Sequence, residues 1–223
     1  MRLNELSSAC ERYTILGETF DNATRDFLKS TRPTFEISDP DHGRALMIWL
    51  NKWGCRQFAR VDHFSALTQL DEWAPSNLGS LPHVGASLTD LSDPALVRLA
   101  SAYDNLRSLQ ASRKRRNDAD ISVSFGPTGA AKILYALRPD CCPPWDDKIR
   151  KHFGWDGAGE SYCSFLKTVR SQIQELVSDA NQVGIDPQDI PGKVGRPCSS
   201  LPKLVDEYYW ITITRRSSTL NPE

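Results

Sequence analysis

The sequence has no long apolar run. No segment reaches the roughly 18 uninterrupted apolar residues of a transmembrane helix, so none is predicted. The beginning of the chain, MRLNELSSACERY, also lacks the apolar core of a secretory signal peptide. Hydrophobic residues make up 39% and charged residues 25% of the 223 positions, which is ordinary for a globular protein. We therefore expect a soluble cytoplasmic protein with no membrane contact.

Cysteine is present but not in a pattern that would bind metal. The six cysteines include no CxxC pair, and the adjacent Cys141 and Cys142 are poorly placed for a shared metal or a framework disulfide. The four histidines are scattered along the chain. The sequence thus predicts reduced thiols, no zinc or iron–sulfur site, and no cofactor.

Positive and negative charges nearly balance over the whole chain. The net charge is −1, so no global attraction to nucleic acid is expected. Residues 113–170 nevertheless hold eleven Lys or Arg against seven Asp or Glu. This basic half opens with RKRR at 113–116, which fits either a solvated loop or a contact to phosphate oxygens.

Helical periodicity dominates the remainder. Apolar stripes at helical spacing occur in four places and predict helices there: Leu16, Phe20, Ala23 and Phe27; Leu46, Trp49, Leu50 and Trp53; Leu96, Leu99, Ala100, Tyr103 and Leu106; and Tyr162, Phe165, Leu166, Val169, Ile173, Leu176 and Val177. A last helix is expected over 201–209. The only alternating segment, ISVSF at 121–125, is too isolated to predict a sheet. We expect an all-α protein of eight to ten helices, with lobes at 1–40 plus 160–223 and at 41–159.

One stretch combines a glycine-bounded turn, a short apolar helix and a possible capping aspartate. In GPTGAAKILYALRPDCCPPWDDKIRKHFG, Gly126 and Gly129 bound a short turn that leads into an apolar helix. The first N–H groups of that helix can hold a phosphate, although a plain turn between helices is the alternative. Asp146 follows Pro144 and Trp145 and is a good N-cap for the next helix.

This order of turn, helix, loop and aspartate resembles the helix-hairpin-helix DNA glycosylase superfamily. The matching segment is Pro144, Trp145, Asp146, Asp147, Lys148 and Ile149, and ISVSF stands where the family has its first hairpin helix. The resemblance implies one glycosylase-like unit over 1–223, two lobes flanking a DNA-binding groove, and the hairpin and catalytic segment at 124–154.

The resemblance also implies roles for individual residues. It makes Asp146 the carboxylate that stabilises positive charge on the deoxyribose and activates water. Asp147 is the neighbouring alternative. Lys132 is a candidate Schiff-base nucleophile, and it equally fits a phosphate contact or a solvated helix position. We expect a monofunctional enzyme in which water attacks.

Binding residues follow from the same likeness. A flipped base needs aromatic walls, for which the candidates are Trp49, Trp53, Phe125, Tyr135 and Trp145, although Trp49 and Trp53 also fit core packing. Contacts to the DNA backbone are expected from Gly126, Gly129, Ala130, Lys148 and Arg150.

The sequence therefore predicts a monomeric glycosylase acting on double-stranded DNA. Its substrate would be a damaged base or a modified phage base, such as a hydroxymethylated or glucosylated cytosine. The alternatives are a non-catalytic DNA-binding protein that uses the same hairpin, and a helical protein-interaction module.

Overall fold

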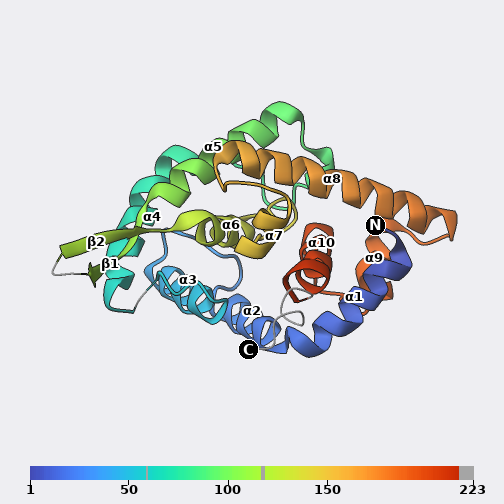
Figure 1. Cartoon of the computed structure of the whole chain (residues 1–223), viewed down its shortest axis with the longest axis horizontal. Coiled ribbons are helices and arrows are strands. Elements are labelled where there is room, and N and C mark those ends of the chain that lie inside the picture. Colours follow the sequence, from blue (N-terminus) through green and yellow to red (C-terminus); the bar gives the residue numbers. More distant parts are fainter. Residues whose placement is uncertain (59, 117–118, 216–223) are drawn as a thin grey trace.

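The computed structural model describes residues 1–58, 60–116 and 119–215, and this part of the chain is mainly helical (Figure 1). Its α-helices are α1 Leu3–Leu16, α2 Glu18–Ser30, α3 Pro40–Lys52, α4 His63–Asn77, α5 Asp93–Ser108, α6 Gly126–Leu137, α7 Asp147–His152, α8 Gly159–Gln182, α9 Ile190–Lys193 and α10 Leu201–Tyr209. Two strands, β1 Gln110–Arg116 and β2 Ala119–Ser124, pair as an antiparallel β-ribbon. The mainly helical prediction is confirmed.

Local sequence signals explain where several helices begin. The side chain of Asp39 accepts hydrogen bonds from the first amides of α3, and Ser92 and Ser200 cap α5 and α10 in the same way. Each of these three caps is followed by a proline in the first turn, where its missing N–H costs nothing. These three helix starts are therefore fixed locally.

The core is built around α6. Its residues Gly129 to Leu134 are all buried, and α5 and α8 pack together over one side of it (Figure 1). The predicted stripe of α8 is buried from Tyr162 to Leu176. Although α8 is the longest helix, neither it nor any other described helix is long and apolar enough to cross a membrane.

A smaller cluster joins the two ends of the chain. Leu6 and Cys10 of α1 pack with Leu176 of α8, Ile190 of α9 and Leu204 of α10. Tyr162 to Ile173 of α8 belong to the main core, and Leu176 and Ala180 belong to this cluster. α8 therefore connects the main core to the smaller cluster.

The expectation that ISVSF is too isolated to form a sheet is wrong, because residues 121–124 lie in β2 and pair with β1. Of the two alternatives for RKRR, the solvated loop is wrong, because these four residues form most of β1. The β-branched Ile121 and Val123 favour this extended pairing, opposite Lys114 and Ser112. The helix expected before Gly126 is thus replaced by a strand, and Gly126, with φ of +66°, turns the chain from β2 into α6.

Candidate active site

A cavity of about 450 Å³ is lined by residues from both ends and from the middle of the chain. Tyr13, Phe20, Lys203, Asp206 and Trp210 line it from the two ends of the chain. The segment at 53–57, the first turn of α6, Lys132 and residues 144–147 line it from the middle. This volume falls within the range of about 300–1,000 Å³ that is usual for small-molecule sites. The cavity collects Asp146, Lys132, Trp53 and Trp145 from the residues singled out in the sequence.

Asp146 is both a helix cap and a wall of this cavity. Its Oδ1 accepts a hydrogen bond from the backbone N–H of Ile149 at 2.8 Å, which caps α7. Its Oδ2 accepts one from the hydroxyl of Thr214 at 2.8 Å. Thr214 lies in the terminal segment Trp210–Arg215, whose first residue also lines the cavity. Two hydrogen bonds from different elements therefore fix the orientation of the carboxylate.

Lys132, the third residue after Gly129 in α6, lines the cavity. Its ammonium donates a hydrogen bond to the backbone carbonyl of Trp53 and lies 5.4 Å from the centre of the Trp53 ring. The residue is only 9% exposed. The amine is thus positioned inside the protein, and it is not the solvated helix residue that was one of the alternatives.

Trp53 is the predicted aromatic residue that best fits a wall. It is 8% exposed and lines the cavity, and its indole N–H donates to the carbonyl of Phe20 at 3.1 Å. Trp49 and Tyr135 lie against it, with ring centres at 4.6 and 5.8 Å. Neither of these two lines the cavity, so they support Trp53 instead of bordering the space.

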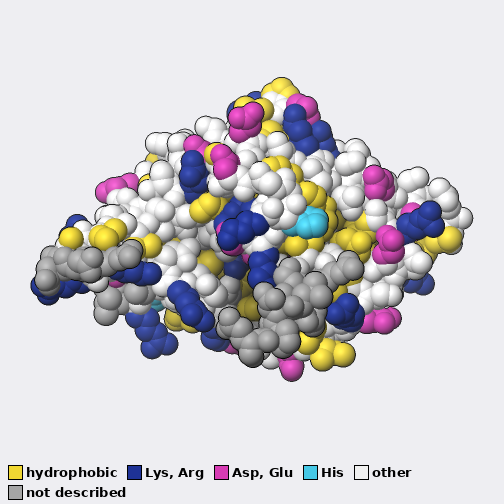
Figure 2. Space-filling view, in the orientation of Figure 1, with side chains coloured by type: hydrophobic (Ala, Val, Ile, Leu, Met, Phe, Trp, Pro, Cys, Tyr) yellow, Lys and Arg dark blue, Asp and Glu magenta, His cyan; other side chains and the backbone are white. Residues whose placement is uncertain are grey.

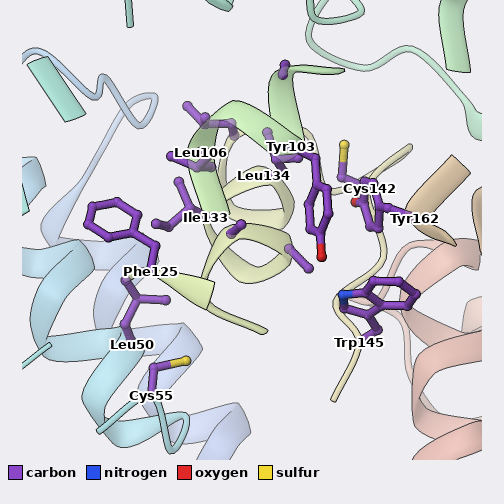
Figure 3. Packing of buried hydrophobic residues seen from close by; sticks show 14 of the residues in the cluster. Leu50, Cys55, Tyr103, Leu106, Phe125, Ile133, Leu134, Cys142, Trp145 and Tyr162 are labelled. Carbon is purple, nitrogen blue, oxygen red and sulfur yellow. The ribbon is translucent and has the colours of Figure 1, made fainter. Parts of the chain in front are cut away.

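Trp145 and Phe125 are core residues. Both are 0% exposed. Trp145 packs against Tyr103 and Tyr162 on one side of α6, while Phe125 lies on the other side (Figure 3). Trp145 borders the cavity, and its indole N–H donates to the carbonyl of Pro127 at 3.3 Å. Complete burial leaves Phe125 no access to a base, against the expectation for this residue.

The glycine-bounded turn is the first turn of α6. Gly126 has open space where a side chain would point, and residues 126–128 line the cavity. Gly129 and Ala130 are buried instead. A Cβ added to Gly129 would lie 2.9 Å from Nε2 of Gln57 and 3.0 Å from Phe58. The two predicted glycines therefore differ, because Gly126 is partly exposed, whereas Gly129 is buried and permits close packing.

The basic residues after Asp146 also differ. Arg150 is 8% exposed, and its guanidinium donates to the Thr128 hydroxyl at 2.9 Å and to Asp147 at 3.1 Å. These contacts tie α7 to α6 and leave a DNA phosphate little access to Arg150, against the expectation for it. Lys148 is exposed and donates to the carbonyl of Thr214.

Asp147, the alternative to Asp146, is held by cations. Lys151 lies 2.6 Å from one of its oxygens and Arg150 lies 3.1 Å from the other. The hydrogen bond from Lys151 contributes most to lowering the pKa of this carboxyl. Both oxygens of Asp147 are therefore engaged in ion pairs in the first turn of α7. Of the two aspartates, Asp146 is the better placed to act in the cavity.

A buried charged cluster on α10 was missed by sequence reasoning. Lys203 lies 2.7 Å from Asp206 and 3.6 Å from Glu207, and Glu207 also pairs with Arg196 at 2.8 Å. Arg196 in turn binds Asp21. The signal was three charged residues within the otherwise apolar segment LPKLVDEYY. Two of the three, Lys203 and Asp206, line the cavity.

Burial and neighbouring charges shift the pKa values of two cavity residues on α10, Asp206 and Lys203. Burial raises the pKa of Asp206 to about 6, against the opposing influence of Lys203, and the nearby charge of Asp146 adds to the rise. Burial disfavours the charged form of Lys203, but Asp206 and Glu207 outweigh it and raise the pKa of Lys203 well above its usual value. The cavity is thus lined by three carboxyl groups, from Asp146, Asp147 and Asp206, and by two ammonium groups, from Lys132 and Lys203.

No family model matches this chain, and neither a curated protein nor a solved structure matches it. Within residues 1–58, 60–116 and 119–215, no group of three or more His, Cys, Asp or Glu could hold a metal ion.

Proposed function

We propose that the protein is a DNA glycosylase that hydrolyses the N-glycosidic bond of a base turned out of the duplex into the cavity. One observation carries the proposal. Asp146, with its orientation fixed by two hydrogen bonds, borders the same partly aromatic cavity as the lysine of the glycine-bounded helix. The family resemblance gives candidate roles to both residues, which lie 14 positions apart in the sequence.

The cavity fits the demands of the reaction. A base that is to be cut must first leave the stack, and it is then held by aromatic and apolar side chains with a few polar groups. Trp53 supplies a ring supported from behind by Trp49 and Tyr135. Lys203 and Asp206 supply a donor and an acceptor side by side at 2.7 Å, suited to the polar edge of a base.

Asp146 would act at the sugar. As the bond between C1′ and the base nitrogen breaks, its electron pair leaves with the base and positive charge grows on the deoxyribose. The carboxylate stabilises that charge and takes a proton from the attacking water, which forms the new bond to C1′. The base nitrogen takes up a proton, and the product is an abasic site.

Lys132 is the alternative nucleophile. Its ammonium donates to the carbonyl of Trp53, and an attacking amine would have to give up this bond and a proton. A water activated by Asp146 needs neither change. We therefore assign the attack to water and keep Lys132 as a cation beside the sugar.

Duplex DNA would approach the first turn of α6. Residues 126–128 border the cavity, α6 has no side-chain cap, and Lys148 is exposed close by at the start of α7. Uncapped N–H groups at a helix start attract phosphate. In this proposal, residues 126–128 and Lys148 contact the DNA backbone, in place of the buried Gly129, Ala130 and Arg150.

The test is a panel of labelled duplexes that carry damaged bases or hydroxymethylated or glucosylated cytosines. After incubation with the protein, alkali cleaves any strand that contains an abasic site. The proposal expects cleavage at one class of base. Salt-dependent binding without cleavage of any duplex would favour the non-catalytic DNA-binding alternative, and failure to bind any duplex would remove both.

A further inference from the structure

The β-ribbon extends from the helical body as an exposed basic arm. We use this name for residues 113–115 of β1 and 120–122 of β2, all of which are exposed. Figure 1 shows the ribbon reaching past the helices at one end of the molecule, and Figure 2 shows Lys and Arg side chains gathered near it. An isolated two-stranded ribbon is marginally stable in water, so an arm exposed on both faces gains little from the core.

The positive charge of the arm is only partly balanced within it. Arg115 stands opposite Asp120 in the strand pairing. Arg113 stands opposite Ser122, and Lys114 opposite Ile121, so their direct cross-strand neighbours carry no charge. A basic surface of this kind is complementary to phosphates.

The arm is anchored beside the cavity. At its base Ala111 and Ser112 are 0% and 1% exposed, and the N–H of Phe125 donates to the carbonyl of Leu109 at 2.7 Å. The carbonyl of Phe125 accepts a hydrogen bond from Gln57, also at 2.7 Å, and Gln57 lines the cavity. The next residue, Gly126, lines it as well. The arm therefore leaves the body within a few residues of the cavity wall.

We propose that the basic arm lies in a groove of duplex DNA beside the nucleotide that enters the cavity, with Arg113 and Lys114 against phosphates. The major groove, about 12 Å wide, admits a two-stranded β-ribbon. The choice of duplex DNA as the partner of the arm rests on the proposed function, which places a duplex at the cavity. Contacts of this kind position the protein on DNA and do not select the base.

The experiment measures binding to an unmodified duplex by fluorescence anisotropy between about 50 and 200 mM salt. The arm variant is Arg113→Gln with Lys114→Gln. The control removes the same charge at two exposed positions elsewhere, Arg98→Gln with Lys193→Gln. Loss of two phosphate contacts should reduce the slope of log K against log salt by about 1.8. The parent would then lose roughly twelvefold more affinity than the arm variant over this range.

Thermal melting first confirms that both variants fold, and nuclease footprinting gives a second measurement. On a duplex that carries the base that the parent excises, the parent should protect base pairs beside that base that the arm variant leaves open, with the control unchanged. An unchanged slope and footprint in the arm variant would overturn the proposal, as would equal losses in the control. If the parent excises a base while the arm variant keeps its slope, only the arm is refuted. A parent that binds no duplex refutes the arm and the proposed function together.

Discussion

Replacing Lys203 by methionine should strongly destabilise the fold. The Lys203 side chain is 5% exposed and lies 2.7 Å from Asp206 and 3.6 Å from Glu207. Glu207 keeps Arg196 at 2.8 Å, so Asp206 is the carboxylate that loses its main partner. Removing one member of a buried ion pair costs about 3–5 kcal/mol, because the other charge stays buried. The free energy of unfolding of Lys203→Met should fall by this amount.

The loss should depend on pH in a defined direction. Burial raises the pKa of Asp206 from 3.8 to about 6, and Lys203 works against this rise. Without Lys203 the pKa of Asp206 in the folded state goes higher. A folded pKa above the unfolded one means that the folded state binds a proton which the unfolded chain releases. This contribution to stability is present below the unfolded pKa and is lost as the pH rises through the folded pKa.

Urea unfolding at about pH 5 and about pH 8 measures both effects. Lys203→Met should lose less stability at the lower pH, where Asp206 takes up a proton. Adding Asp206→Asn to Lys203→Met should recover part of the loss at the higher pH, since the uncompensated charge is gone. A loss below about 1 kcal/mol at the higher pH, or one independent of pH, would refute the reasoning.

Three further predictions concern the cavity and its support. Gly129→Val should cost about 1–3 kcal/mol in urea unfolding, because the new side chain meets Gln57 and Phe58; Gly79→Val, where nothing lies within 4 Å of an added Cβ, is the control and should cost less. Thr214→Val removes a hydrogen bond to Asp146 and should slow base release in single-turnover assays, though less than loss of the charge itself; an unchanged rate would count against that bond. Lys132→Ala should still release the base, and borohydride should trap no adduct with the parent protein. An adduct that forms with the parent and is lost in Lys132→Ala would instead make Lys132 the nucleophile.

The helices were predictable because their signals are local. The stripe from Leu96 to Leu106 is buried within α5, and the expected helix over 201–209 coincides with α10. The β-ribbon was not predictable in the same way. RKRR carries no alternation of apolar and polar residues that would predict a strand. That it pairs with residues 119–122 is seen only in the structure.

The cavity could be predicted only in part. Asp146 and Lys132 were found because they lie in one continuous motif. Tyr13, Lys203 and Asp206 come from the ends of the chain, and only tertiary packing brings them to the same space. The helical periodicity of the apolar residues favoured a core position for Trp49, and its side chain is buried in the structure. For Trp145, its place in a proline loop suggested a wall; it does border the cavity, but packing against Tyr162 and Phe165 leaves it 0% exposed.

Substituting Asp146 by asparagine tests the central claim most directly. Asparagine is nearly as good a cap as aspartate, so the melting temperature should stay close to that of the parent, as should duplex binding. On the duplex that the parent cleaves, single-turnover formation of abasic sites should fall by roughly 10²-fold or more, the effect of losing one electrostatic stabiliser. If Asp146→Asn instead forms abasic sites at the parent's rate, Asp146 serves only to cap α7, and the proposed catalytic role is contradicted.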